Sequence, residues 1–103
     1  MFIFVYITCS DREEAEKIAG LLVKKKFVAC VNYFPIGSIY RWKCKIEKGK
    51  EHALICKTIR ENFEKIEKEV KKIHSYENPA ILAIPIIDGS REFLDWILSE
   101  MDS

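Results

Sequence analysis

The chain opens with a short apolar segment followed by an amphipathic one. Residues 2–9 are apolar, β-branched or aromatic, and the run is too short for a core helix, so it predicts a buried strand. Ser10 and Glu13 have the spacing of a capping box, which predicts the start of a helix. One apolar stripe at helical spacing supports this helix: Ala15, Ile18, Ala19, Leu22 and Val23.

Strand character returns over residues 27–34 and is interrupted by Pro35-Ile36-Gly37, which predicts a bulge or bend. Residues 40–46 then alternate, and this pattern places Tyr40, Trp42, Cys44 and Ile46 on one face. The charged residues 47–51 around Gly49 predict a turn, and residues 53–58 predict the returning strand of a hairpin.

The second half of the chain repeats the alternation of helix and strand. Thr58 and Glu61 have capping-box spacing, and an apolar stripe from Phe63 to Ile73 predicts a helix with Glu–Lys pairs on its outer face, at 61–65, 64–68 and 67–71. Residues 80–87 predict a strand, and Pro85 places it at a sheet edge because proline cannot donate to a ladder. A last short helix contains Phe93, Leu94, Trp96 and Ile97.

The element order strand–helix–strand–strand–helix–strand predicts one α+β domain over residues 1–103, a ferredoxin-like split βαβ sandwich with an extra C-terminal helix. The predicted hairpin is long: residues 28–46 would span about 60 Å if extended. It must therefore overhang the domain or fold back at residues 35–37. An overhang would expose aromatic side chains and strand edges, so we favour an oligomer over a single chain with a twisted, solvated hairpin.

Composition narrows the class of protein. With 17 Lys and Arg against 16 Asp and Glu in 103 residues, the net charge is +1, which does not favour nucleic acid or an anionic membrane as a partner. The apolar runs are too short for a membrane helix, and the first residues lack the features of a signal peptide, so we expect a cytoplasmic protein. The cysteines at 9, 30, 44 and 56 have no zinc-binding spacing, and we expect small, buried, reduced side chains.

Six motifs together resemble the divalent-cation tolerance (CutA) family: Ala29-Cys30-Val31-Asn32, Tyr40-Arg41-Trp42, Ile46-Glu47, Lys57-Thr58, His74-Ser75-Tyr76-Glu77-Asn78-Pro79 and Phe93-Leu94-Asp95-Trp96. Their order and spacing match that family over nearly the whole chain. The resemblance implies a ferredoxin-like fold, a tight homotrimer built through the long hairpin, and binding of copper or another divalent metal linked to metal tolerance. It implies no enzymatic activity and no required cofactor.

The resemblance also implies where a metal would bind. Family members proposed to bind copper use a first-strand cysteine and histidines before a His-x-Tyr segment. Here His74 matches the histidine of that segment, Ile73 precedes it, and Cys9 lies two residues after the family's cysteine position, which is Ile7. Thiolate and imidazole suit Cu(I) or Zn(II). The alternative for His74 is a structural role at the C-terminus of the helix.

Five further residues are candidates for an interface or a cleft between subunits: Tyr40, Trp42, Glu47, Lys57 and Tyr76. Packing is the simpler role for the aromatic residues, and Glu47 and Lys57 would form either an intersubunit pair or a solvated surface pair. No nucleophile elbow, P-loop or dinucleotide motif is present, so an enzyme is not favoured. The alternative function is a regulatory trimer that binds a small anionic ligand or a protein partner in its clefts.

Overall fold

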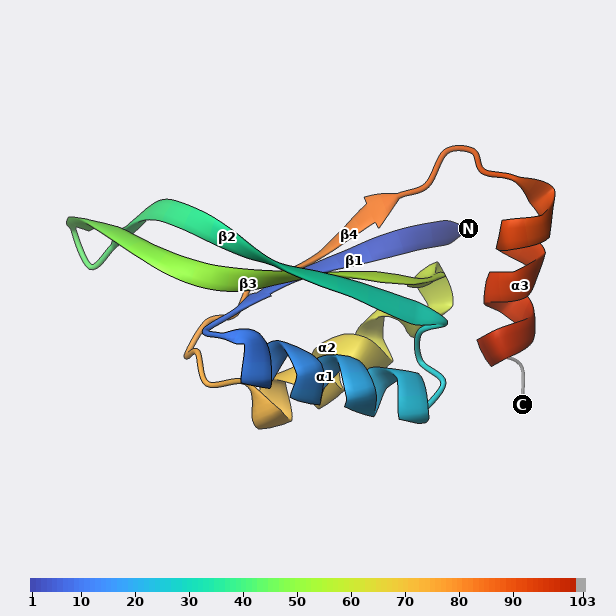
Figure 1. Ribbon diagram of the computed structural model, residues 1–103, viewed down its shortest axis with the longest axis horizontal. Coiled ribbons are helices and arrows are strands. Elements are labelled where there is room, and N and C mark those ends of the chain that lie inside the picture. Colours follow the sequence, from blue (N-terminus) through green and yellow to red (C-terminus); the bar gives the residue numbers. More distant parts are fainter. Residues whose placement is uncertain (102–103) are drawn as a thin grey trace.

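A computed structural model describes residues 1–101 of the chain (Figure 1). The elements follow the order strand–helix–strand–strand–helix–strand, with one further helix. Their bounds are β1 (Phe2–Cys9), α1 (Arg12–Lys24), β2 (Cys30–Trp42), β3 (Lys45–Ile59), a 3₁₀ turn (Arg60–Asn62), α2 (Phe63–Ile73), β4 (Ile81–Pro85) and α3 (Arg91–Met101). The predicted α+β fold is confirmed, and the predicted domain extends two residues beyond the described part.

The four strands form one antiparallel sheet in the order β2-β3-β1-β4. Helices α1 and α2 cover one face of this sheet, and the other face is open (Figure 1). Side chains of β1 alternate between the two faces, so that Ile3, Val5, Ile7 and Cys9 are buried under the helices. The sheet order places β4 at an edge, as its proline predicts. This is the ferredoxin-like split βαβ arrangement.

Strands β2 and β3 pair in one uninterrupted register from Cys30↔Lys57 to Trp42↔Lys45. The predicted bulge at residues 35–37 is therefore wrong: Pro35 lies in β2, the outermost strand on its side of the sheet, where a missing N–H is tolerated. The predicted turn at residues 47–51 is also wrong. The chain turns at Lys43 and Cys44, whose φ angles of 49° and 68° are typical of a type I′ hairpin.

The position of the turn changes which side chains share a face. Ile46 pairs with Arg41, whereas Trp42 pairs with Lys45, so Ile46 lies on the opposite face from Tyr40 and Trp42. The prediction that these three residues share a face is wrong. Cys44 is exposed in the turn rather than buried.

The hairpin overhangs the domain instead of folding back. Strand β1 pairs with β3 only as far as Cys9↔His52, so residues 36–51 pair with each other alone. We call residues 36–51 the arm. It projects from one end of the molecule, whose long dimension is 44 Å (Figure 1). The arm exposes large apolar side chains, with Ile39 71%, Ile46 67%, Tyr40 47% and Trp42 40% exposed.

The helix starts differ from the predicted capping boxes. The N-cap of α1 is Asp11, which accepts a hydrogen bond from the Glu14 amide at 2.9 Å, so the cap lies one residue later than Ser10. Thr58 belongs to β3 and caps nothing; its hydroxyl donates to the Phe27 carbonyl at 2.6 Å. Among the three predicted Glu–Lys pairs of α2, the described side chains form only the last, Glu67–Lys71 at 3.0 Å.

Helix α3 stands against β3 at the end of the molecule opposite the arm (Figure 1). Ile97 is its buried anchor. The Met101 sulfur lies 3.3 Å from the Thr58 hydroxyl oxygen and accepts a weak hydrogen bond from the Asn62 amide at 3.6 Å. The other large apolar side chains of α3 are less well covered, and Phe93, Trp96 and Leu98 remain substantially exposed.

The backbone strain at Lys43 and Cys44 can be relieved by residues that adopt positive φ more readily. Replacing Lys43 by Asn and Cys44 by Gly should raise the free energy of unfolding by about 1 kcal/mol, because asparagine and glycine accept positive φ at lower cost. Urea denaturation of the double variant measures this change. The control is Lys45→Asn, which alters extended backbone and should not stabilise. A double variant no more stable than the wild type would contradict the type I′ turn.

Candidate functional site

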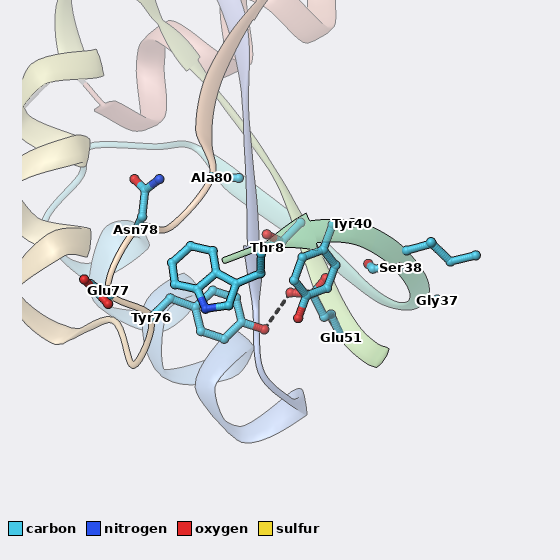
Figure 2. A pocket seen from close by; sticks show the side chains of 11 residues that line it. Thr8, Gly37, Ser38, Tyr40, Glu51, Tyr76, Glu77, Asn78 and Ala80 are labelled. Carbon is cyan, nitrogen blue, oxygen red and sulfur yellow. Dashed lines mark hydrogen bonds between the residues drawn. The ribbon is translucent and has the colours of Figure 1, made fainter. Parts of the chain in front are cut away.

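The root of the arm and the loop between α2 and β4 enclose a cleft of about 660 Å³ (Figure 2). Its walls come from the end of β1, from both strands of the arm and from the loop at residues 76–80. The residues that line it are Thr8, Gly37, Ser38, Ile39, Tyr40, Trp42, Glu51, Tyr76, Glu77, Asn78 and Ala80. Segments far apart in the sequence therefore meet at this end of the sheet.

Three of the five predicted cleft or interface residues line this cleft: Tyr40, Trp42 and Tyr76. The Tyr76 hydroxyl donates to Glu51 at 2.5 Å, the dashed contact in Figure 2. Burial and this carboxylate both raise the pKa of Tyr76, so the phenol stays protonated. The two remaining candidates lie elsewhere. Glu47 pairs with Tyr40 along the arm, and Lys57 bonds Asn32 and lies 5.8 Å from the Phe93 ring centre.

His74 ends α2 and turns its fully buried side chain toward the end of β1. Its Nδ1 accepts a hydrogen bond from the Tyr76 amide at 3.0 Å, which leaves Nε2 as the donor to the Thr8 carbonyl at 2.8 Å. Both ring nitrogens are therefore engaged. The imidazole joins three segments, and a metal ion at either nitrogen would have to replace a hydrogen bond.

Cys9, the second predicted metal ligand, is buried at the end of β1, next in sequence to the carbonyl that His74 contacts. Its thiol donates a weak hydrogen bond to the Asp11 carbonyl at 3.6 Å. Burial raises the pKa of Cys9 to about 11, and the charge of Glu14 adds to the effect. The thiol is thus protonated at neutral pH, and binding a metal would require it to lose that proton.

Glu14 joins the two loops at this end of the domain. Its carboxylate accepts four hydrogen bonds, from the amide and hydroxyl of Ser10 and from the amide and hydroxyl of Ser75, at 2.7 to 2.9 Å. It also lies 3.9 Å from Nδ1 of His74. Burial opposes ionisation of Glu14, but the hydrogen bonds outweigh it and hold the pKa below its usual range.

The structure thus places the two predicted metal ligands at the same end of the domain. Soft thiolate and imidazole donors suit Cu(I) or Zn(II). The described residues contain no group of three or more His, Cys, Asp or Glu side chains arranged to hold a metal ion. Within residues 1–101, no helix has both the length and the apolarity needed to cross a membrane.

Two residues of this region, Glu14 and Glu51, were not predicted from the sequence. Glu14 has the spacing of a capping residue, counted from Asp11 rather than from Ser10, so a shift of one position would have found it. Glu51 fell within the turn that was predicted at residues 47–51. Its contact with Tyr76 joins residues 25 positions apart, and no local pattern encodes such a pair.

Comparison with known proteins gives a consistent result over the whole fold. The family model described as CutA1 divalent ion tolerance protein matches residues 3–100. The divalent-cation tolerance protein CutA of Archaeoglobus fulgidus is 54% identical over 94 residues, which are 91% of this chain and 92% of that protein. The chloroplastic protein CutA of Arabidopsis thaliana is 38% identical over 96 residues, 92% of this chain and 53% of that protein.

A solved structure agrees with these sequence matches. It is described as the periplasmic divalent cation tolerance protein CutA from Archaeoglobus fulgidus. It superposes with a TM-score of 0.97 at 51% identity and covers 99% of this chain and 100% of that chain. The related proteins thus carry both periplasmic and chloroplastic descriptions.

The Glu14 hydrogen bonds should make stability depend on pH. Glu14→Gln should lower the free energy of unfolding at pH 7 by about 1–3 kcal/mol, because an amide cannot satisfy four donors. The folded-state pKa is depressed, so the wild-type advantage is present above the ordinary pKa of about 4.3 and is lost as pH falls through the folded value. Urea titrations at pH 7 and below pH 4 measure this difference.

The neighbouring Glu13→Gln provides a matched control, because Glu13 is exposed and its side chain makes no hydrogen bond to the described residues. It should change stability little at either pH. Equal destabilisation by the two substitutions at pH 7 would contradict the assignment of Glu14 as the link between the loops.

Proposed function

The chain belongs to the CutA1 divalent ion tolerance family, and we propose that it acts in divalent-cation tolerance as a non-enzymatic homotrimer that binds copper or another divalent metal ion. The observation that carries this proposal is the family match over residues 3–100 together with the fold shared at a TM-score of 0.97. In this proposal its partners are further copies of itself and metal ions, and its location is the cytoplasm.

Self-assembly is supported by the apolar surface that one protomer leaves uncovered. The arm exposes Ile39, Tyr40, Trp42 and Ile46, and the edge strand β4 exposes Leu82 and Ile84. A two-stranded ribbon has little stability alone, so contact with a second chain would stabilise the arm. Packing the arm of one copy against a different surface of the next is a heterologous contact, which forms a closed ring when the rotation between copies closes. Three copies is the number that the CutA resemblance implies.

Two tryptophans test this interface. Trp42→Ala should weaken assembly, because Trp42 lies on the arm, whereas Trp96→Ala on α3 should change it less. Light scattering across micromolar concentrations should give about three times 12.1 kDa for the wild type and a lower mass for Trp42→Ala on dilution. A wild-type mass of 12.1 kDa would contradict the homotrimer. Equal dissociation of both variants would contradict the placement of the interface on the arm.

Metal binding in this proposal involves Cys9 and His74. The protonated thiol of Cys9 and the hydrogen-bonded ring of His74 both oppose a metal ion, so affinity should be moderate and should increase with pH. Two protein ligands do not make the closed four-ligand site of a structural zinc. The ion would therefore exchange with solvent, and the fold would not depend on it.

Copper titration tests the site. Cu(I) affinity should fall at least tenfold in Cys9→Ser and in His74→Gln, because each substitution removes one of two ligands. Cys44→Ser is the essential control, since Cys44 is exposed and would bind copper without any site. A chelator should leave the melting temperature of the wild type almost unchanged.

Two results would contradict the metal site. One is an affinity that survives the loss of both Cys9 and His74 but falls in Cys44→Ser. The other is a large decrease in melting temperature with chelator, which would mean that the metal is structural.

The 660 Å³ cleft supports a second candidate, a regulatory trimer that holds a small ligand or a partner between its subunits. Its lining combines Tyr40, Trp42 and Tyr76 with the carboxylates of Glu51 and Glu77, and no described Lys or Arg lines it. This composition favours a neutral or cationic group over the anion considered from sequence. Lys57, the only cationic residue among the five cleft or interface candidates, lies outside the cleft lining and is bonded to Asn32.

A further inference from the structure

A second cleft, of about 590 Å³, lies where the C-terminus of α1 approaches α2 and α3, away from the arm. Four of its nine lining residues are lysines, and none of the described lining residues is acidic. They are Lys24, Lys25, Lys26, Phe27, Ile59, Asn62, Lys65, Leu98 and Met101. We call it the lysine cleft. We propose that the lysine cleft binds an anion that carries several phosphate groups. This proposal is independent of metal binding and of the number of subunits.

Two of the ammonium groups converge on one aromatic ring. The Nζ atoms of Lys25 and Lys65 each lie 5.9 Å from the ring centre of Phe27. Lys65 has Glu61 four residues before it, the favoured geometry for a helical ion pair, yet that pair is not formed within the described residues. The side chain lies instead over Phe27. Two positive charges therefore lie near one ring, and a polyanion that reaches both would gain electrostatic free energy.

The backbone at Lys26 supplies an independent observation. Helix α1 ends in a Schellman motif, with the Phe27 amide bonded to the Leu22 carbonyl at 3.1 Å and the Lys26 amide to the Val23 carbonyl at 3.0 Å. Lys26, the first residue after the C-cap, has a left-handed backbone with φ of 62°, a conformation that favours glycine. A lysine costs about 1 kcal/mol more than glycine at such a position. The positive charge that Lys26 adds to the cleft would explain why a lysine occupies this position.

The floor of the cleft is held in place before any ligand arrives. The Phe27 carbonyl accepts hydrogen bonds from the Thr58 hydroxyl at 2.6 Å and from the Asn62 amide at 3.0 Å. Thr58 and Asn62 are both buried. The ring that lies near two ammonium groups is thus anchored to the sheet, and binding would order only the lysine side chains.

Opposing charges reduce the positive field but do not cancel it. Glu69 pairs with Lys25 at 2.9 Å and with Lys72 at 3.4 Å, so it offsets part of the charge of Lys25. The C-terminal end of α1 carries a partial negative charge, although the Schellman bonds satisfy two of its carbonyls. Lys24, Lys26 and Lys65 have no carboxylate within 4.0 Å among the described residues. Within residues 1–101, three of the four lysines that line the cleft therefore have no ion-pair partner.

The size and lining of the cleft indicate the class of ligand. Lysine binds phosphate as a point charge, and several lysines match a chain of phosphates better than a single one. The volume is within the range of small-molecule sites. Phe27, Ile59, Leu98 and Met101 add an apolar wall on which a base could rest. A phosphate chain alone and a nucleoside polyphosphate share the charged part of this chemistry.

Isothermal titration calorimetry with tripolyphosphate, at 150 mM salt and on the full chain, tests the proposal. The wild type should bind, and Lys26→Gly and Lys65→Gln should each lose affinity about fivefold, the loss expected for about 1 kcal/mol. Lys68→Gln is the matched control, because it removes an exposed lysine of α2 that does not line the cleft. Lys26→Gly should also melt at a higher temperature, because glycine relieves the left-handed backbone.

Each result of these titrations either supports or overturns the proposed phosphate site. Weaker binding by a more stable Lys26→Gly supports a site that depends on charge and excludes damage to the fold as the cause. No binding by the wild type, unchanged affinity in Lys26→Gly and Lys65→Gln, or an equal loss in Lys68→Gln would overturn the proposal. ATP in a parallel titration distinguishes the source: tighter binding than tripolyphosphate indicates a nucleotide, and equal binding indicates the phosphate chain alone.

Discussion

The rest of the structure depends on the unbroken register between β2 and β3. Thirteen consecutive residue pairs join these strands, from Cys30↔Lys57 to Trp42↔Lys45. Strand β1 pairs only with the last eight residues of β3. Helices can cover the sheet where β1 lies beneath them, but the remaining pairs have no core. The arm is the direct consequence, and so is its exposed apolar surface. A protomer of this shape has the large exposed apolar groups that mark an interaction surface.

The same geometry separates the molecule into two ends with different chemistry. At the root of the arm, hydrogen bonds join the end of β1 to the loop after α2, through His74, Glu14 and the Tyr76–Glu51 contact. Hydrogen bonds that connect segments distant in sequence hold loops in one conformation. At the other end, α1 finishes in three successive lysines beside α3. The proposed metal ligands and the proposed phosphate cleft therefore lie at opposite ends of α1.

The sequence predicted those features that local pattern controls. Element order, the edge position of β4 and the C-terminal end of α2 followed from periodicity and from Pro85. The turn was missed because Lys43 and Cys44 are not turn residues: pairing along the arm imposes left-handed backbone on them. That error reversed the face of Ile46, since side chains alternate along a strand. The position of His74 at the end of α2 was predicted, but its two hydrogen bonds depend on residues brought together only by the fold.

The central claim is that the arm is completed by a second chain. Hydrogen-exchange mass spectrometry of residues 36–51 tests it most directly, because a two-stranded ribbon in solvent opens readily and its amides exchange fast. If assembly covers the arm, its amides are protected at micromolar concentration and lose protection when dilution dissociates the protein. Fast exchange in the arm at every concentration, while the β1–β3 amides remain protected, would contradict the account.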